Sequence, residues 1–570
     1  MNSHSLFVGD GDLAAAPETA ARAPAASGPD APAGQRQTAP ADARGSRDRD
    51  PRLYRFGFVA LHREDFPPEG EAQSLPRHLG WRRRLMGPIA LWTHPETTLR
   101  VVGTGGVRFV FLGEVIPETD PALGDPFSPE RLAAVVEGGD PALYDFLDTL
   151  AGRFALMVVE EERVRVFHDP MGARSVFYWS EGPFAVASHA RLLARCVGAP
   201  PDPVIHALRR DPRFRRRKTK CLPGDLTLAL GVQALTPNNG FDSATRSTAR
   251  YWPRQPRRPG TLEDFHRALE HSMAALGRYA GAGHRPLIGA TDGVDSRLLI
   301  AAFLKLGIRF ETATWQMSKL AEPKRRIIRA LARQAGEPHL ETRATQADDR
   351  TRAVARSNGG GYKPVYQSTF DMRGAYGDRP EMLFIRGHGA EVMRGFFNIW
   401  PTRMKAPTAA EMARLYWSPA GNEVPPDLPE MFEGYIRRAN WAAVAEMGFD
   451  PNDIFYWEHR MGMWSAGLNN EFDVAMRSVP GFNSRQLFAA ALGLPPETRL
   501  TKKLFLDAVE RFEPRLSGIP LGKMVAAPEA RQAAAASSGR EGVLASIRRA
   551  TAGARKAARR GARTGRRVPT

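Results

Sequence analysis

The sequence predicts an α/β protein with a strand-rich first part and a parallel, doubly wound sheet in its second part. Within residues 53–197 apolar runs alternate with charged turns, and Phe154–Val159 and Val164–Phe167 flank one such turn as a hairpin would. From about Thr261 onward, strand patterns alternate with helix patterns. That alternation is typical of a parallel sheet with helices on its faces.

The elements expected in the second part follow one another closely. A helix expected over residues 323–335 ends at Gly336, and glycine commonly terminates helices. After about residue 450 the pattern is helical. We expect strands at 285–290, 308–315 and 382–385, with a helix at 296–306 after the first strand.

Length and composition exclude several classes of protein. The 570 residues, 42% hydrophobic and 25% charged, suffice for two domains of ordinary globular composition. No apolar run approaches the ~18 residues that span a bilayer, and the first residues lack an apolar signal core. The two cysteines, Cys196 and Cys221, exclude a disulfide framework and a cysteine-rich zinc site. We therefore expect a cytoplasmic protein without a membrane span.

The net charge of +18 is concentrated at one end of the chain. Residues 548–570 hold eight arginines, one lysine and no acidic residue, which is half of the excess. Such a block is usually a solvated extension, although it can bind polyanions loosely. No base-reading motif accompanies it, so nucleic acid is not an expected partner.

Changes in composition divide the chain into five segments. Residues 1–52 are rich in Ala, Pro and Gly and poor in aromatic residues, so we expect a disordered tail. Domains are predicted at 53–200 and 259–525, joined by a basic linker with Pro and Gly at 201–258. Residues 526–570, rich in Ala, Ser and Arg, are expected to form a basic disordered tail.

The hexapeptide Thr291–Ser296 joins the first strand of the second domain to its helix. A helix that starts directly after a strand presents free backbone N–H groups, which favour an anion. The hydroxyls of Thr291 and Ser296 can add donors to phosphate oxygens, and Asp295 can bind Mg²⁺. The same residue types also cap ordinary helices, so the hexapeptide alone leaves both interpretations open.

The hexapeptide resembles the S-G-G-x-D-S loop of the ATP-pyrophosphatase superfamily. Thr291 replaces the serine, and Asp292 replaces the first glycine. The resemblance implies an adenine-nucleotide α-hydrolase-like fold with a pyrophosphate (PP) loop, a doubly wound parallel sheet and C-terminal helices. It also implies that Thr291, Asp292, Gly293, Asp295 and Ser296 bind the phosphates of ATP.

A second segment, Arg386–Gly395, follows the strand at 382–385, about 95 residues after the hexapeptide. It resembles the pattern S-G-x-G-[GAS]-D-E-x-x-G of asparagine synthetases. On that match Gly387 and Gly389 let the backbone approach the nucleotide. His388 takes the position that holds a catalytic Glu or Tyr in different branches, and a histidine there is also similar to lasso-peptide cyclases.

The same resemblance assigns metal ligands and a catalytic lysine. Glu391 takes the place of the second Mg²⁺ carboxylate, beside Asp295, while the acid that normally follows is lost as Val392. Lys523 falls where the family has a lysine that would stabilise the transition state of acyl transfer. An exposed surface lysine is the alternative interpretation of Lys523.

The first domain resembles the glutaminase half of asparagine synthetases. Gly152–Ala155 matches G-x-F-A, and Asp169–Tyr178 matches R-D-P-x-G-x-R-P-L-Y. The resemblance implies an N-terminal Ntn-hydrolase-like αββα sandwich of the class II amidotransferase type. Active members use a cysteine at position 2, where this chain has Asn2, and Leu112 replaces the asparagine of the N-G-E segment. Because nucleophile and oxyanion donor are both lost, glutamine hydrolysis is not expected.

Together these features are similar to a glutaminase-dead branch that includes β-lactam synthetases and lasso-peptide cyclases. The resemblance implies an ATP- and Mg²⁺-dependent ligase that joins a small-molecule or peptide carboxylate to an amine through an acyl-adenylate, releasing AMP and pyrophosphate. The alternative is a non-catalytic homologue that binds a nucleotide or a partner. Asp292 favours that alternative, since two like charges 4 Å apart repel by about 4 kcal/mol at an effective dielectric of 20. The sequence leaves both substrates and the oligomeric state open.

Overall fold

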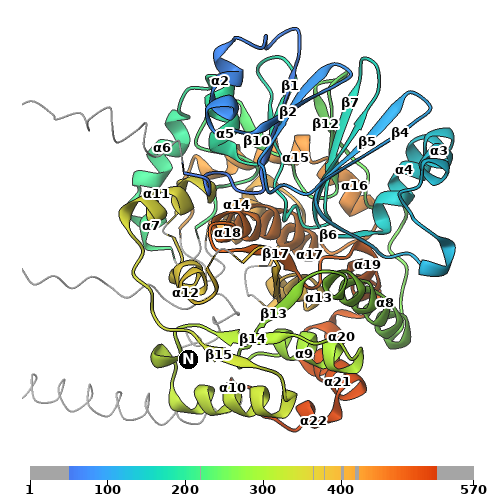
Figure 1. Cartoon of the computed structure of the whole chain (residues 1–570), viewed down its shortest axis with the longest axis vertical. Coiled ribbons are helices and arrows are strands. Elements are labelled where there is room, and N and C mark those ends of the chain that lie inside the picture. Colours follow the sequence, from blue (N-terminus) through green and yellow to red (C-terminus); the bar gives the residue numbers. More distant parts are fainter. Residues whose placement is uncertain are drawn as a thin grey trace, which may run out of the picture.

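The structure, a computed structural model, describes residues 50–217, 220–363, 365–377, 379–399, 403–417 and 423–522. Most of both predicted tails, and Lys523, lie outside the described residues. Within these ranges the chain forms two six-stranded antiparallel sheets and one five-stranded parallel sheet. The antiparallel sheets lie at one end of the molecule and the parallel sheet at the other (Figure 1). The predicted α/β class is confirmed.

The first antiparallel sheet has the strand order β10-β8-β9-β1-β3-β2 and the second has the order β12-β11-β7-β6-β5-β4. The first contains β1 (Phe58–His62), β2 (Arg82–Met86), β3 (Ile89–Thr93), β8 (Phe177–Trp179), β9 (Ala185–Ala187) and β10 (Val232–Ala234). The second contains β4 (Leu99–Thr104), β5 (Val107–Pro117), β6 (Leu150–Val159), β7 (Val164–His168), β11 (Asn239–Asp242) and β12 (Ser247–Arg250).

These two sheets pack face to face, with helices on both outer faces. The core between them takes Phe58 and Leu91 from the first sheet and Val110 and Met157 from the second. Helices α2 (Glu71–His78) and α5 (Ala190–Cys196) cover the first sheet. Helices α3 (Pro129–Glu137) and α4 (Gly139–Asp148) cover the second. The layer order is therefore helix, sheet, sheet, helix, as expected for this part of the chain.

The segment 201–258 is structured, which differs from the linker that we predicted. It forms α6 (Pro203–Arg210), α7 (Pro212–Arg216) and the strands β10, β11 and β12. Strand β10 pairs with β8 at the edge of the first sheet, and β11 pairs with β7 in the second. The segment therefore completes both antiparallel sheets, because its backbone groups find partners there.

The parallel sheet has the order β15-β14-β13-β16-β17, and each neighbouring pair runs parallel. The chain starts at the central strand, moves to one edge and then crosses to the other side, so the order reverses between β13 and β16. Ligands of such sheets bind beyond the carboxyl ends of the strands at this switch point. The strands are β13 (Arg285–Gly289), β14 (Glu311–Thr314), β15 (His339–Glu341), β16 (Met382–Arg386) and β17 (Arg477–Pro480).

Helices cover both faces of the parallel sheet. One face packs against α8 (Leu262–Gly281) and α9 (Asp295–Lys305), with α10 (Glu322–Ala335) and α21 (Lys503–Phe512) beyond them. On the other face Phe384 of β16 joins a core with Met372 of α12 (Gln367–Tyr376) and with Phe472 of α18 (Ala466–Phe472). Helix α10 ends at Gly336, whose φ of 71° lies in the left-handed region, as predicted.

The remaining helices fill the space between the sheets and around the parallel sheet. They are α11 (Asp349–Asn358), α13 (Ala390–Met393), α14 (Ala409–Trp417), α15 (Leu428–Arg438), α16 (Trp441–Glu446), α17 (Pro451–Phe455), α19 (Arg485–Gly493), α20 (Pro496–Arg499) and α22 (Pro514–Ser517). A π-helical stretch, Tyr456–Ser465, connects α17 to α18. None of the described helices is both long and apolar enough to cross a membrane.

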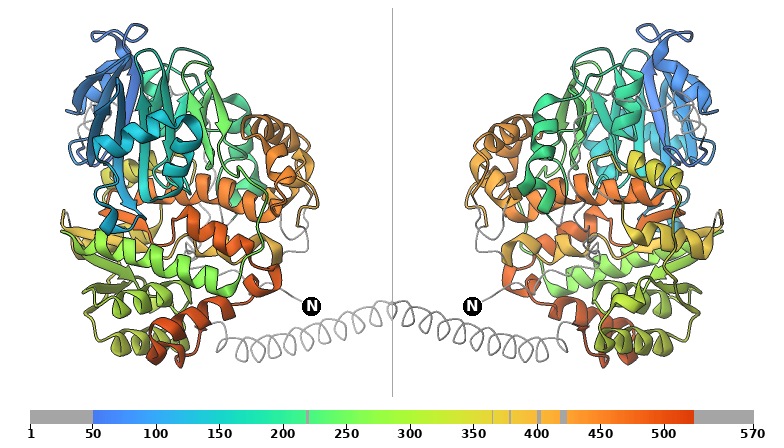
Figure 2. Two further views of the ribbon diagram at one scale, coloured as in Figure 1. Left: turned by 90° about the vertical axis from the view of Figure 1, so that its right-hand side faces the viewer. Right: turned by 90° about the vertical axis from the view of Figure 1, so that its left-hand side faces the viewer.

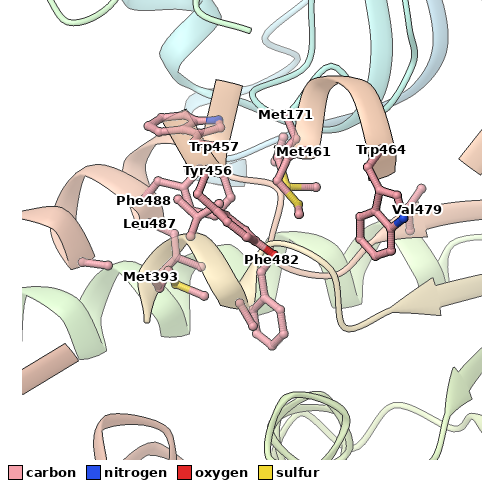
Figure 3. Packing of buried hydrophobic residues seen from close by; sticks show 14 of the residues in the cluster. Met171, Met393, Tyr456, Trp457, Met461, Trp464, Val479, Phe482, Leu487 and Phe488 are labelled. Atoms are coloured by element: carbon pink, nitrogen blue, oxygen red, sulfur yellow. The ribbon is translucent and has the colours of Figure 1, made fainter. Parts of the chain in front are cut away.

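A core of large side chains joins the N-terminal layers to these helices. Met171 lies beside Met461 and Trp457 (Figure 3), and all three are buried. The indole N–H of Trp457 donates to the carbonyl of Pro170 at 2.7 Å. Side views place the antiparallel sheets directly over these helices (Figure 2). The two predicted halves therefore share one continuous core.

A buried ion pair crosses the same boundary. Arg153 of β6 donates to both carboxylate oxygens of Asp473, at 2.5 and 2.8 Å, and neither side chain is exposed. Arg174 donates to the same carboxylate at 3.3 Å. Two guanidinium groups thus share one carboxylate that lies between α18 and β17.

We predict that Asp473→Asn lowers the free energy of unfolding by about 3–5 kcal/mol, because two buried guanidinium groups lose their counter-charge. Urea unfolding followed by circular dichroism measures the effect. The control is Glu263→Gln, which removes an exposed ion pair with Arg511 and should change stability by less than about 1 kcal/mol. Equal effects of the two changes would contradict the prediction.

Candidate functional site

A cavity of about 60 Å³ lies at the carboxyl ends of β13, β14 and β16, at the switch point of the parallel sheet. Its lining includes Thr291 and Ser296 of the predicted loop together with Gly387 and His388 of the second segment. The fold therefore brings both predicted motifs to one place. The remaining lining residues are Gly289, Trp315, Gln316, Tyr366, Gln367, Ser368, Phe384, Arg386 and Leu468.

The loop is held closed by its own hydroxyl groups. The Thr291 and Ser296 hydroxyls share a hydrogen bond of 2.7 Å, and the Thr291 N–H donates to Ser296 Oγ at 3.2 Å. The Gly293 N–H donates to Thr291 Oγ1 at 3.2 Å. Helix α9 begins immediately afterward at Asp295. The tight loop thus directs the start of α9 toward the cavity, as an anion site requires.

Asp292, which departs from the family loop, has a cation beside it. Lys324 Nζ of α10 lies 3.5 Å from Asp292 Oδ2. The Gly522 N–H donates to the Asp292 carbonyl at 3.1 Å, and the Asp292 carboxylate leaves no room for a Cβ at Gly522. Because Lys324 offsets its charge, Asp292 repels an incoming phosphate less than the sequence alone suggests.

Arg297 holds residues 516–520 beside the loop Thr291–Ser296. Its guanidinium donates to the carbonyls of Leu516, Ile519 and Pro520. Burial lowers the Arg297 pKa to about 10, while the charge of Asp292 acts in the opposite direction. The segment ending at Gly522 is therefore part of the site.

Asp295 and the second segment are in direct contact. Arg394, just after α13, donates to Asp295 Oδ2 at 2.7 Å. A Cβ at Gly387 would lie 3.2 Å from Asp295 Cβ, and Gly389 has a φ of 101° with the Phe482 carbonyl 3.0 Å from its would-be Cβ. Packing alone therefore requires small residues at 387 and 389. Their contact with a nucleotide stays a prediction.

The predicted Mg²⁺ ligands, Asp295 and Glu391, are both buried at this edge of the sheet. The described residues contain no cluster of three or more His, Cys, Asp or Glu side chains placed to hold a metal. Mg²⁺ at nucleotide sites needs only one or two protein carboxylates, because phosphates and water supply its other ligands. The carboxylates of Asp295 and Glu391 fit that preference. Arg394 would compete with Mg²⁺ for the Asp295 carboxylate.

His388 is buried beside the cavity, and its Nδ1 shares a hydrogen bond of 3.0 Å with Ser465 Oγ. The ring lies 5.9 Å from that of Trp464. Burial, followed by the charges of Arg386 and Arg460, holds the His388 pKa well below its ordinary value. The imidazole is therefore neutral at physiological pH and can accept a proton or a hydrogen bond.

Sequence reasoning missed three basic residues of the site: Lys324, Arg386 and Arg394. Arg386 and Arg394 lie within the second segment. The signal for Arg386 was an arginine at the position where the family pattern has a serine. Lys324 reaches Asp292 from a different helix, so no local pattern indicates it. Lys523, predicted as catalytic, lies outside the described residues.

Among the described residues, neither cysteine is an exposed nucleophile. Cys196 and Cys221 are both buried, and burial raises the pKa of the Cys196 thiol to about 12. Leu112 is buried between the sheets. The carboxylate of Glu114 accepts from Arg477 and from the Tyr279 hydroxyl.

The chain just before β1 is fastened to the other half of the molecule. The Tyr54 N–H donates to Asn358 Oδ1 at 2.8 Å, and Asn358 Nδ2 donates to the Arg52 carbonyl at 3.0 Å. Arg350 donates to Asp50 at 2.9 Å. The segment before β1 is therefore anchored to α11.

No family model matches this chain, and no curated protein matches it. Among solved structures, the allosteric regulatory enzyme of purine biosynthesis aligns at 12% identity with a TM-score of 0.23, covering 53% of this chain and 78% of that chain. Glutamine phosphoribosylpyrophosphate amidotransferase from B. subtilis, complexed with ADP and GMP, aligns at 12% identity with a TM-score of 0.21, covering 61% and 73%. Neither likeness identifies the fold or function of this chain.

We predict that the purified protein does not release glutamate from glutamine above the buffer background. The described cysteines are buried, and the thiolate is the form of cysteine that attacks a carbonyl. A coupled glutamate dehydrogenase assay measures the rate. Glutamate release that falls in Cys196→Ser or Cys221→Ser would overturn this prediction.

We predict that the His388 imidazole stays neutral from pH 8 to pH 6, whereas an imidazole in water titrates near pH 6.5. Its depressed pKa places protonation below this window. Nitrogen-15 chemical shifts of the ring measure the charge, and His388→Gln assigns the signal. A His388 signal that titrates between pH 6 and 7 would show that the ring is not buried as described.

Proposed function

We propose that this protein is a cytoplasmic, ATP-dependent ligase that forms an amide bond without hydrolysing glutamine. The observation that supports it is the convergence of the loop Thr291–Ser296 and the turn Gly387–His388 on one cavity at the switch point of a parallel sheet. A helix start that faces the cavity favours polyphosphate there. Lys324 and Arg394 offset the charges of Asp292 and Asp295 beside it.

In the proposed reaction a carboxylate oxygen of the acyl substrate attacks the α-phosphorus of ATP, and pyrophosphate leaves. An amine then attacks the acyl carbon of the adenylate, and AMP leaves. Mg²⁺, held by Asp295 and Glu391, would neutralise charge on the phosphates. Thr291, Ser296 and the start of α9 would hold the pyrophosphate, and Lys523 would stabilise charge that develops during acyl transfer.

His388 has the geometry for a role in the second step. It lines the cavity with a neutral imidazole, and Ser465 fixes the ring through Nδ1. Its other nitrogen can accept a proton from the attacking amine. Because its low pKa makes it a weak base, the amine must enter the site already neutral.

Two observations favour a second candidate, a homologue that binds a nucleotide or partner without turnover. Asp292 and Asp295 are both paired with cations, Lys324 and Arg394. The cavity of about 60 Å³ is also small for a nucleotide. The two candidates differ in turnover, which variants of the loop can test.

If the protein is a ligase, Asp292→Gly should reduce pyrophosphate release by roughly tenfold, since the loop loses its contact with Lys324. Asp295→Ala should abolish release, because Asp295 is the proposed metal ligand. Pyrophosphate is measured by a coupled assay across a panel of carboxylates and amines, and MgATP binding by calorimetry. Glu263→Gln, on the exposed surface of α8, is the control.

The same variants distinguish the second candidate. In a non-catalytic homologue, Asp292→Gly removes a negative charge from the loop, so MgATP affinity should rise without turnover. If neither Asp292→Gly nor Asp295→Ala changes MgATP binding, ATP does not bind at this loop and the proposed function is wrong.

A further inference from the structure

A second and larger cavity, of about 460 Å³, lies away from the switch point of the parallel sheet. Among the residues that the structure describes, it shares no lining residue with the cavity at the switch point. Its volume lies in the range of about 300–1,000 Å³ that is usual for small-molecule sites. Four stretches that are far apart in the sequence meet there: Arg257 before α8, Arg403–Lys405 before α14, Gly448–Asp453 at the start of α17, and the chain from the end of α19 to the end of α20.

The lining of this second cavity carries more positive than negative charge. Two acidic and four basic side chains line it: Asp450, Asp453, Arg257, Arg403, Lys405 and Arg499. The difference leaves a net charge of +2 around one open space. Such a concentration of one sign of charge raises the local concentration of ions of the opposite sign.

Asp453 and Arg499 balance each other at the floor of the second cavity, and both are only 2% exposed. Asp453 Oδ2 accepts from Arg499 at 2.7 Å, and Asn398 donates to the other carboxylate oxygen at 2.9 Å. The second acid, Asp450, caps α17, and its Oδ1 accepts from the backbone and side-chain N–H groups of Asn452 at 2.9 Å each. Both carboxylates are therefore engaged by neighbouring groups of the protein.

The other three basic side chains have no acidic partner. Among the described residues, no carboxylate oxygen lies within 4.0 Å of the charged nitrogens of Arg257, Arg403 or Lys405. Like charges around one cavity repel each other, at about 1 kcal/mol for a pair 4 Å apart in water and more where water is partly excluded. An anion between them removes that repulsion, so the arrangement favours a negatively charged ligand.

The stretches that carry these cations are fixed by hydrogen bonds. Asn452 bonds both backbone groups of Met404: its Oδ1 accepts from the Met404 N–H at 2.6 Å, and its Nδ2 donates to the Met404 carbonyl at 3.0 Å. Arg257 donates to the carbonyls of Leu492 and Gly493 at 3.2 and 3.1 Å. The positions of the charges are therefore set before a ligand arrives, which lowers the entropy cost of binding.

One wall of the second cavity is apolar. Phe449 lines it and is partly exposed, and its ring lies 4.9 Å from that of Trp252. Phe449 and Arg257 also line an adjoining cavity of about 280 Å³. A ring or another apolar group can pack against Phe449 while an anionic group of the same molecule lies among the cations.

We propose that the second cavity binds a phosphate monoester of a small organic molecule. At neutral pH a phosphate monoester carries about 1.5 to 2 negative charges, which matches the net charge of the lining, whereas a carboxylate carries one. Guanidinium groups bind phosphate oxygens through paired N–H groups, and a lysine adds a point charge. The organic part of the ligand packs against Phe449. This site is separate from the proposed ligase site and does not depend on ligase activity.

The test measures binding of phenyl phosphate to the full chain by calorimetry, without nucleotide. The double variant Arg403→Gln/Lys405→Gln should weaken binding at least about tenfold, because it removes two of the charges around the phosphate. The control Arg82→Gln/Lys305→Gln removes the same two kinds of charge from exposed positions elsewhere and should change affinity less than about twofold. Absence of binding to the unaltered chain, or equal binding to the unaltered chain and the first double variant, would overturn the proposal.

Three further probes distinguish the ligand class. Benzoate, a ring with a single negative charge, should bind at least about fivefold more weakly than phenyl phosphate, and so should inorganic phosphate, which has no ring. Phe449→Leu should bring phenyl phosphate close to the affinity of inorganic phosphate. Equal binding of benzoate and phenyl phosphate would contradict the phosphate, and equal binding of inorganic and phenyl phosphate would contradict the organic part. Tighter binding of an oligoglutamate peptide, lost in the same double variant, would show an acidic-peptide site instead and overturn the proposal.

Folding is not expected to limit the test. The side chains of Arg403 and Lys405 are exposed and neither forms a hydrogen bond with a described residue, so circular dichroism should give the same unfolding curve for the double variant as for the unaltered chain. If the double variant does not fold, Lys405→Gln alone should weaken phenyl phosphate about threefold, and an unchanged affinity there would contradict the proposal.

Discussion

The ion pair between Arg153 and Asp473 is the contact on which the site depends. It joins the second antiparallel sheet to the turn between α18 and β17, and both side chains are fully buried. A buried pair costs several kcal/mol of desolvation per ion and is stabilising only with good geometry and further hydrogen bonds. Arg153 meets that condition, since it also donates to the Ala173 carbonyl and to Asn470. Because α18 carries Leu468 and Glu471, this pair positions one wall of the cavity.

The charges around the cavity follow from the same arrangement. Asp473 forms ion pairs with two guanidinium groups, and Glu471 forms an ion pair with Lys363. Arg386 contacts the Asn469 amide and an aromatic ring instead. At the other end of the cavity, the loop carboxylates are paired with Lys324 and Arg394. The low dielectric of a buried site strengthens every one of these interactions.

The sequence predicted the parts of the fold that local patterns control. Helix α10 and its end at Gly336 lie where periodicity and glycine placed them, and the two motifs meet because strand ends of a parallel sheet share one edge. The strands of segment 201–258 were missed, because runs of three or four residues carry no clear period and pair with distant strands. Lys324 and Ser465 were missed for a similar reason, as their contacts with Asp292 and His388 exist only in the tertiary structure.

Buried hydrogen bonds join the N-terminal layers to the helices around the cavity. Asp169 accepts from the N–H groups of Ala173 and Arg174 and from Asn483 of the other half. Asn470 of α18 donates to the Ser188 carbonyl. These residues support the helices around the cavity, so their loss would leave buried polar groups of those helices without partners, each costing about 1–3 kcal/mol.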